Sequence, residues 1–358
     1  MNVLHIIDSL ATGGAEKLLV NTVKYAPWAR HHILTLTDGD SLSSELPDTC
    51  ALHSLGFRSK KDAFRSIRQI RAYIKKHEID LVHSHLVMSN IFSRLATPRQ
   101  IPLFNSLHNL NGEKIFSRRR SLPTLLEKIT YRKRHRIIAV SKAVLDDYQQ
   151  YIGIKGEATV LHNFVDEHFF APSPKTYQHP GTLRMVAVGT LKKQKNYHFL
   201  LDVFRRLPAS CSLHIYGDGP LKEELQKKID TSSVAVKLCG NHPAIHSVIR
   251  DYDLYVMSSQ HEGHPIALVE AMASGMPALV SDIPVLHEAM GEGGLYFNLA
   301  DPDDFVGKIT RILDGSLPLN SYAEFNWKRA AQTARQEDYI HRLYSLYTDA
   351  IKKDRSRK

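Results

Sequence analysis

The chain has 358 residues, of which 43% are hydrophobic and 23% charged, a composition typical of globular proteins. This length suits two domains of ordinary size, each able to bury its own core. Three cysteines without a C-x-x-C pair argue against a disulfide framework or a cysteine zinc site and favour a reducing compartment. No apolar run is long enough for a transmembrane helix, and the first residues are typical of a strand rather than a leader peptide, so we expect a cytoplasmic protein.

The net charge of +10 favours an anionic partner. The excess lies in two stretches: residues 58–76 carry eight Arg or Lys against one Asp, and residues 116–136 carry eight against one Glu. Together these stretches carry +14, so the rest of the chain is near −4. Neither stretch contains a recognisable nucleic-acid-binding motif, and we therefore predict no nucleic acid partner.

Apolar strand-like runs alternate with helix-like segments from the start, the pattern of βα units around a parallel sheet. In the first half, the segments expected to be strands are Val3–Asp8, Ile33–Thr37, Ala51–Leu55, Leu81–His85, Leu103–Leu107, Arg136–Val140 and Thr159–Asn163. A glycine-containing loop at residues 9–14 leads into a helix from Ala15 to about Tyr25. Residues 166–181 contain three prolines and no periodicity, which is typical of a linker.

A second series of the same kind follows this linker. Its expected strands are Leu183–Gly189, Leu213–Gly217, Ala235–Leu238, Leu254–Met257, Ala278–Val280 and Gly294–Phe297. After Pro318 the pattern is helical to the end. We therefore predict an α/β domain at 1–165, a linker at 166–181, a second α/β domain at 182–320 and helices at 321–358.

Two glutamates, Glu262 and Glu270, stand eight positions apart after the strand at Leu254–Met257. Pro265 suits the first turn of a helix and Gly275 suits its end. Glu262 is thus expected on a strand-to-helix loop, at the edge of a parallel sheet where ligands bind. The same spacing also arises by chance, with one glutamate capping the helix and the other facing solvent. Spacing alone leaves both interpretations open.

The longer string from Glu262-Gly263 through Glu270-Ala271-Met272-Ala273-Ser274-Gly275-Met276-Pro277 resembles the E-x7-E signature of the retaining family-4 (group 1) glycosyltransferases. The resemblance implies the GT-B fold, in which two Rossmann-like α/β domains with parallel sheets face each other across a cleft. The final helix would cross back to the first domain. The resemblance also implies a glycosyltransferase that uses a UDP- or GDP-sugar, with the acceptor on the first domain and the donor on the second.

The resemblance assigns roles to individual side chains. Glu270 would accept hydrogen bonds from the ribose hydroxyls, and Glu262 would hold the donor sugar and favour the positive charge of an oxocarbenium-like state. Gly263 would let backbone N–H groups reach the donor, and His264 stands where the family often has an aromatic residue. His108, after the strand Leu103–Leu107, is placed near the donor sugar. The family retains anomeric configuration by front-face attack, with the leaving phosphate taking the acceptor proton.

Glycine-rich turns stand at two strand ends. Gly13 and Gly14 let the backbone approach a ligand, and the following helix N-terminus can bind an anion. Without the full G-x-G-x-x-G pattern, a dinucleotide fold of the hydride-transfer kind is not supported. A tight turn is the alternative, but the family has a loop here that faces the diphosphate and the acceptor. The turn Gly217-Asp218-Gly219-Pro220 resembles a family turn and either lines the nucleotide pocket or is purely structural.

The segment that begins at Gly189 supplies the positive charge expected beside a leaving diphosphate. Lys195 matches the lysine of the family pattern, whereas Thr190 stands where an arginine is usual. Either Lys192 or Lys193 replaces that charge, or donor binding is weaker. The Asp-x-Asp metal motif of the other common glycosyltransferase fold is not part of this pattern, so we predict that no metal or other cofactor is required.

Histidines 83 and 85 are interpreted as the end of a strand rather than as a metal-binding pair. The family resemblance further implies a glycan or lipid-linked acceptor in surface polysaccharide or lipopolysaccharide biosynthesis. The sequence gives neither the donor sugar nor the oligomeric state. Three other interpretations stay open: a GT-B nucleotide-sugar epimerase, a basic nucleic-acid-binding protein, and an inactive partner subunit, for which only Thr190 is a hint.

A membrane surface is the anionic partner that we favour. On a helix through 58–76, basic and apolar side chains separate onto two faces. The basic face would contain Lys61, Arg65, Arg68, Arg71 and Lys75, and the other Ala63, Ile67, Ile70 and Ile74. The second basic stretch, which includes Arg118, Arg119 and Arg120, lies in the same domain. We therefore predict peripheral docking on an anionic bilayer.

Overall fold

The computed structural model describes residues 1–356 except Thr12, 118–120, 178–180 and Ser233. The chain divides into two compact units. The first contains Met1–Asn163 and Gln336–Lys358, and the second contains Phe164–Arg335. In the described part of the chain, no helix is long and apolar enough to span a bilayer.

The first unit is built on a parallel sheet of seven strands in the order β3-β2-β1-β4-β5-β6-β7. The strands are β1 (Asn2–Ile7), β2 (Arg30–Thr35), β3 (Ala51–Ser54), β4 (Leu81–His85), β5 (Leu103–Leu107), β6 (Arg136–Ala139) and β7 (Ala158–Val160). All seven predicted strands of this half are confirmed, and two of them have the predicted bounds. The last strand is shorter than expected, because the chain leaves the sheet after Val160.

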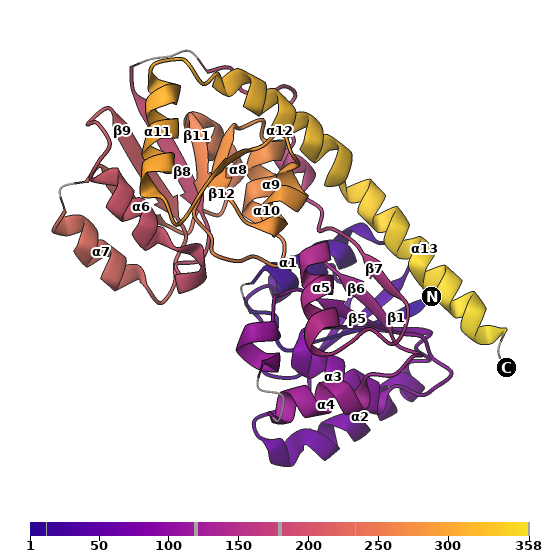
Figure 1. The fold of residues 1–358 in the computed structure, drawn as a ribbon. Coiled ribbons are helices and arrows are strands. Elements are labelled where there is room, and N and C mark those ends of the chain that lie inside the picture. The colour runs from indigo at the N-terminus through magenta and orange to yellow at the C-terminus, as the bar shows by residue number, and fades with distance from the viewer. Residues whose placement is uncertain (12, 118–120, 178–180, 233, 357–358) are drawn as a thin grey trace. The chain divides into compact units, whose positions relative to one another are not determined.

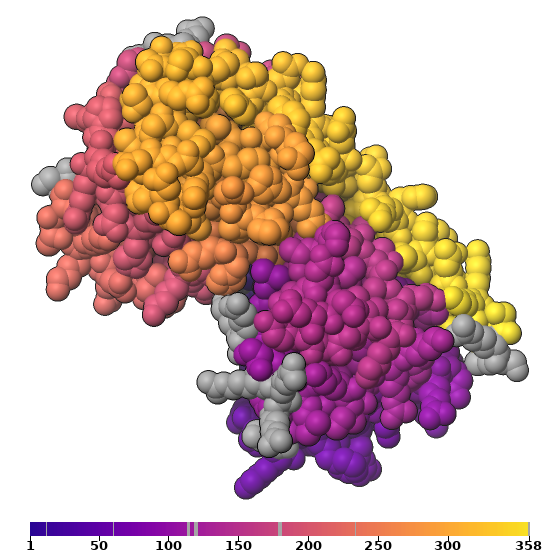
Figure 2. Space-filling model, viewed as in Figure 1, coloured from indigo at the N-terminus to yellow at the C-terminus, as the bar shows by residue number. Residues whose placement is uncertain are grey.

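Helices cover both faces of this sheet. They are α1 (Gly14–Tyr25), α2 (Ala63–Lys76), α3 (Val87–Ala96), α4 (Leu122–Thr130), α5 (Lys142–Tyr151) and α13 (Gln336–Arg355), with short turns η1 (Ser43–Glu45), η2 (Lys60–Asp62) and η3 (Gly112–Phe116). Apolar side chains of α2 and α3 pack on Leu4, Ile6 and Val82. On the opposite face, Tyr347 of α13 packs against His83 and Phe104. The predicted return of the final helix, yellow in Figures 1 and 2, is confirmed.

The second unit contains a parallel sheet of six strands in the order β10-β9-β8-β11-β12-β13. The strands are β8 (Leu183–Val188), β9 (Cys211–Tyr216), β10 (Val236–Gly240), β11 (Leu254–Met257), β12 (Ala278–Ser281) and β13 (Leu295–Phe297), which confirms the six predicted strands. The helices are α6 (Tyr197–Phe204), α7 (Lys222–Asp230), α8 (Ile245–Val248), α9 (Ile266–Ala273), α10 (Pro284–Met290), α11 (Pro302–Leu313) and α12 (Leu319–Thr333), with turns η4 (Glu167–Phe169), η5 (Lys193–Lys195) and η6 (Ile249–Asp251). Leucines of α6 and Phe305 of α11 close the core.

Both sheets reverse their strand order once. In the first sheet the reversal lies between β1 and β4, and in the second it lies between β8 and β11. In open α/β sheets, ligands bind outside the carboxyl ends of the strands at this switch point. The loops that follow these four strands are therefore the places where binding residues are expected.

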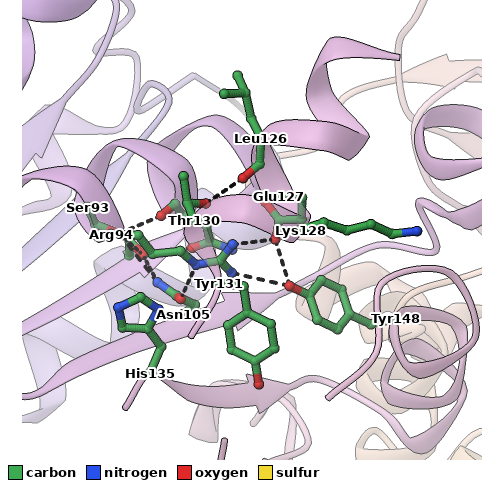
Figure 3. A network of polar contacts seen from close by, with 12 residues as sticks. Ser93, Arg94, Asn105, Leu126, Glu127, Lys128, Thr130, Tyr131, His135 and Tyr148 are labelled. Carbon is green, nitrogen blue, oxygen red and sulfur yellow. Dashed lines mark hydrogen bonds and ion pairs between the residues drawn. The ribbon is translucent and has the colours of Figure 1, made fainter. Parts of the chain in front are cut away.

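A buried ion pair holds α4 against α3 in the first unit (Figure 3). The guanidinium of Arg94 lies 2.8 Å from the carboxylate of Glu127, and both side chains are almost fully buried. Arg94 also donates to Asn105 Oδ1 at 2.7 Å, and the Tyr148 hydroxyl donates to Glu127 at 2.8 Å. Because the charges are paired and hydrogen-bonded, the cost of removing them from water is offset. The network thereby fixes α4 on the sheet.

Candidate active site

In the second unit, Glu262 and Lys195 meet at the switch point. Glu262 lies on the loop after β11 and is 5% exposed. Its Oε1 atom lies 2.7 Å from Lys195 Nζ and accepts a hydrogen bond of 2.6 Å from Ser259 Oγ. Its Oε2 atom accepts from Gln194 Nε2 at 3.2 Å. Loops that follow two different strands thus bring a carboxylate and an ammonium group together.

The two loops are held together by hydrogen bonds to their backbones. Ser258 Oγ donates to the carbonyls of Lys195 and Asn196 at 2.9 and 3.0 Å. The Gln260 amide donates to the Gln194 carbonyl at 2.9 Å. These bonds connect the segment after β8 to the segment after β11, so the position of Lys195 relative to Glu262 is set by hydrogen bonds close to both residues.

Two glycines allow these loops to pack closely. Gly217 has a φ of +146°, and a Cβ atom there would lie 2.1 Å from the Gly189 carbonyl oxygen. A Cβ atom on Gly189 would lie 3.0 Å from Cε of Lys195, so glycine at this position leaves room for the lysine side chain. The contact with Gly189 favours the structural interpretation of the Gly217 turn.

Glu270 lies in the second turn of α9 and is half-buried. The helix begins at Ile266, with Pro265 at the N-cap, one residue before the first turn in which we expected it. It ends before Gly275, which has a φ of +74°, as predicted.

Gly263 is buried and His264 half-buried in the loop before the helix. Three residues after β8 are exposed instead: Thr190, Lys192 and Lys193.

In the first unit, His108 follows β5 and is 8% exposed. Its Nε2 atom lies 3.1 Å from His85 Nδ1, at the end of β4. Burial lowers the pKa of His108 to about 4, so the imidazole is neutral near pH 7. A neutral ring can donate or accept a hydrogen bond to a sugar hydroxyl, but it carries no charge for the diphosphate.

The glycine loop lies after β1, at the switch point of the first sheet. Gly13 is the N-cap of α1 and Gly14 its first residue. A Cβ atom on Gly13 would lie 2.3 Å from a carboxylate oxygen of Glu16, so a side chain at this position would displace Glu16. The loop and the N-terminus of α1 thus have the arrangement expected of a site that approaches a ligand through its backbone.

Sequence reasoning missed a pocket of about 490 Å³ at this switch point. Its lining residues are Asp8, Leu86, Val87, Met88, Asn109, Asn111, Ile115, Ser121 and Pro123. Asp8 Oδ1 accepts from the Ser89 amide at 3.0 Å and from its hydroxyl at 2.6 Å, and burial raises the pKa of Asp8. A pocket with carboxylate, amide and hydroxyl groups beside apolar side chains can bind a sugar ring by its hydroxyl edge and its apolar face.

The two sheets have the GT-B architecture, and matches to known families and structures show a nucleotide-sugar-dependent glycosyltransferase. Family models match the chain in both halves: Glycosyltransferase Family 4 over residues 12–169, and Glycosyl transferases group 1 over residues 182–315. The chain belongs to the family-4 (group 1) glycosyltransferases, as its resemblance implied.

Relatives and solved structures agree with this assignment. EpsF from Bacillus subtilis, which is named as a putative glycosyltransferase, is 25% identical over 94% of this chain and 90% of its own length. An Escherichia coli UDP-Gal:alpha-D-GlcNAc-diphosphoundecaprenol alpha-1,3-galactosyltransferase is 25% identical over 80% of each chain. The structure of Anabaena Alr3699/HepE with UDP has a TM-score of 0.84 at 18% identity and covers 98% of this chain and 100% of its own. This likeness shows the fold.

Proposed function

We propose that this chain transfers a sugar from a UDP-sugar to a glycan or lipid-linked acceptor and retains the anomeric configuration. The observation that carries the proposal is the pairing of buried Glu262 with Lys195 at the switch point of the second sheet. UDP is favoured over GDP because the similar Anabaena protein was solved with UDP and with UDP-glucose.

The contacts of Glu262 indicate how the site would respond to a donor. Lys195 is the cation that pairs with Glu262, while Ser259 and Gln194 also bond the same carboxylate. When a diphosphate enters, Lys195 can turn toward it, and the two neutral donors still hold the carboxylate. Lys195 would then stabilise the leaving diphosphate, and Glu262 would bind the sugar and favour its positive charge. Glu270 would bind the ribose.

The pocket beside Asp8 is the place that we propose for the acceptor sugar. Asp8, Asn109 and Asn111 provide groups that can bond hydroxyls, and Val87 and Ile115 provide apolar contact. His108 follows the same strand as Asn109, which supports its proposed place near the reacting sugar. Because the Escherichia coli relative is named for a diphosphoundecaprenol-linked acceptor, a lipid-linked glycan is the acceptor class to test first, within surface polysaccharide or lipopolysaccharide assembly.

A surface with exposed apolar side chains adjoins this pocket. Helices α2, α3 and α4 are neighbours (Figure 1). They carry five of the seven exposed large hydrophobic side chains of the described residues. These five are Phe64, Leu95, Leu122, Leu125 and Ile129, of which Ile129 is 60% and Phe64 72% exposed. The last three follow one side of α4, whose first turn contributes Pro123 to the pocket wall. A glycolipid could therefore have its sugar in the pocket and its chain in the bilayer.

Helix α2 and the segment after α4 also carry exposed basic side chains. The predicted basic face of α2 is exposed, and Ile70 and Ile74 on its other side are buried, so the amphipathic pattern is confirmed. Arg132 and Lys133, which follow α4, are also exposed. Arg118, Arg119 and Arg120 lie outside the described residues. Each basic residue near an anionic bilayer contributes roughly 1 kcal/mol, and the exposed leucines add apolar contact, so we propose peripheral docking with shallow insertion of α4.

A panel of UDP- and GDP-sugars tests the donor half of the proposal. A ligand that binds only the native state must raise its stability. We expect one or a few UDP-sugars to raise the melting temperature and to yield UDP when a polyprenyl-diphosphate-linked sugar is added. Conversion of the nucleotide sugar without any acceptor would instead indicate an epimerase. Stabilisation by no nucleotide sugar would contradict the proposal.

A further inference from the structure

Histidines crowd the face of the first sheet that α13 covers. His5 of β1 and His83 of β4 are direct partners in the strand register, and His85 lies two residues further along the same face. The three side chains are 0%, 2% and 4% exposed. Each offers one ring nitrogen, and these three atoms lie within 4.8 Å of one another. His5 and His83 have no role in the proposed transfer. His85 is connected to it only through its contact with His108.

Hydrogen bonds determine where the proton of His5 lies. His31 Nε2 is 2.8 Å from the Ala26 carbonyl, which can only accept, so His31 has its proton on Nε2. In a neutral imidazole the Nδ1 atom of His31 then has a lone pair, and it accepts from His5 Nε2 at 3.1 Å. His5 Nδ1 is left with a lone pair. It is buried and has no hydrogen-bond partner among the described residues.

His85 has the same arrangement. Its Nδ1 atom bonds His108 Nε2 at 3.1 Å, and its Nε2 atom is buried without a hydrogen-bond partner in the described part of the chain. His83 differs, because Nδ1 lies 2.5 Å from the Tyr347 hydroxyl and Nε2 lies 2.7 Å from Ser106 Oγ. One of these hydroxyls can keep its hydrogen bond to the ring while a metal ion replaces the other. Histidines that bind metals have this pattern, with one nitrogen on the metal and the other on a hydrogen-bond partner.

We propose that His5, His83 and His85 bind one divalent transition-metal ion, with Zn²⁺ as the first candidate. Neutral imidazoles suit zinc, copper and nickel, whereas magnesium and calcium prefer oxygen ligands. The ion would join β1 to β4 beneath α13 and would hold His85, and through it His108, in one orientation. This role is structural, so it goes beyond the proposed function and does not depend on it. A buried water molecule that donates hydrogen bonds to two such nitrogens is the alternative occupant of the site.

Metal content of the full chain tests the proposal. Protein stripped with a chelator is dialysed against Zn²⁺ alone or Co²⁺ alone, and bound metal is measured by mass spectrometry. We expect one ion per chain, a higher melting temperature, and the visible absorption of four-coordinate cobalt. His5→Gln and His85→Gln should each weaken binding by more than the roughly 10- to 100-fold that the loss of an outer-shell partner costs. His32→Gln is the matched control, because His32 is 2% exposed and lies outside the cluster, beside Tyr73.

Two results would overturn the metal site. One is folded wild-type protein that binds less than about a tenth of an equivalent, which would favour water. The other is binding that persists in folded His5→Gln and His85→Gln variants, which would place the ion on other residues. If the variants do not fold, X-ray absorption of zinc-loaded wild-type protein decides: three imidazole ligands support the site, and a shell without imidazole refutes it.

Discussion

Glu262 shows how a single residue combines structural and proposed catalytic roles. Its carboxylate is buried and receives hydrogen bonds from Ser259, Gln194 and Lys195. Ser259 and Gln194 are neutral donors, so their hydrogen bonds to the carboxylate do not depend on the position of the lysine. We propose that these two donors keep the carboxylate in place when the lysine turns to a substrate phosphate.

The first prediction concerns this pair. Glu262→Gln and Lys195→Ala should each lower kcat/KM at least about tenfold, because a hydrogen bond to a charged group contributes roughly 1.5–3 kcal/mol. Steady-state kinetics with the donor found in the panel measure the loss. Glu224→Gln is the matched control, since Glu224 belongs to the same unit and is 62% exposed beside His198. Wild-type turnover in folded Glu262→Gln and Lys195→Ala proteins would remove both residues from the site.

The second prediction concerns His135 and pH. Burial first, and then the charges of Arg134, Arg94, Arg132 and Lys155, lower the pKa of His135 to about 3, whereas an unfolded histidine has a pKa of about 6.5. Between these values the unfolded chain binds a proton that the folded chain does not. Neutral His135 therefore makes its whole contribution to the free energy of unfolding above pH 6.5. Below that pH the free energy of unfolding falls by up to about 1.4 kcal/mol per pH unit.

Urea unfolding at pH 7, 6, 5 and 4.5 checks this effect. His135→Gln should reduce the slope of the free energy of unfolding against pH by the contribution of about one proton. Gln is chosen because it can still accept from the Arg132 backbone amide, which donates to His135 Nδ1 at 3.1 Å. His53→Gln, at an exposed position on β3, should leave the slope unchanged. Equal slopes for wild type and His135→Gln would show that His135 is protonated in the folded state.

At the scale of elements, the Arg94–Glu127 pair decides how α4 is held. Arg94→Met leaves Glu127 buried without its cation, and such a loss costs about 3–5 kcal/mol. Lys142→Met removes one partner of an exposed pair with Asp146, 71% and 61% exposed, and should change stability by about 1 kcal/mol or less. Urea unfolding measures both. The double variant Arg94→Met/Glu127→Leu should recover much of the loss; an Arg94→Met protein as stable as wild type would contradict the role of the network.

Helices α2 and α4 carry the prediction for membrane docking. The chain should pellet with anionic but not neutral vesicles at low salt, and high salt should reverse this because it shortens the Debye length. Leu125→Glu and Ile129→Glu should weaken pelleting, because they place charge on exposed apolar positions of α4. Leu52→Glu, which replaces a 38% exposed leucine on β3, should not. Equal pelleting with both vesicle types would favour a soluble acceptor.

At the scale of the whole molecule, the sequence was most informative where its signals are local. Apolar runs between loop residues predicted every strand of both sheets, and errors are confined to ends such as Val160 and Pro265. The neutral partners of Glu262, Ser259 and Gln194, were missed. Ser259 lies only three residues away, but a serine near a glutamate has no distinctive spacing. Their role became visible only once the two loops were seen to meet.

Long-range contacts explain the other omissions. His5 and His83 are 78 positions apart and become neighbours only because β1 and β4 adjoin at the switch point. Asp8, after β1, and Leu86, after β4, line one pocket for the same reason. Periodicity cannot pair distant strands, so His83 and His85 could be interpreted only as a strand end. The rule that ligands bind where strand order reverses would have pointed to Asp8 if the strand order had been known.

We propose that the site around Glu262 transfers a sugar with retention of configuration. Proton NMR of the first product formed, with an α-linked UDP-sugar as donor and a lipid-linked or short-chain acceptor, tests it most directly. The small coupling constant of an α-linked anomeric proton is the predicted result, and this signal should be strongly reduced with Glu262→Gln. A β-linked first product from the same α-linked donor would contradict the account.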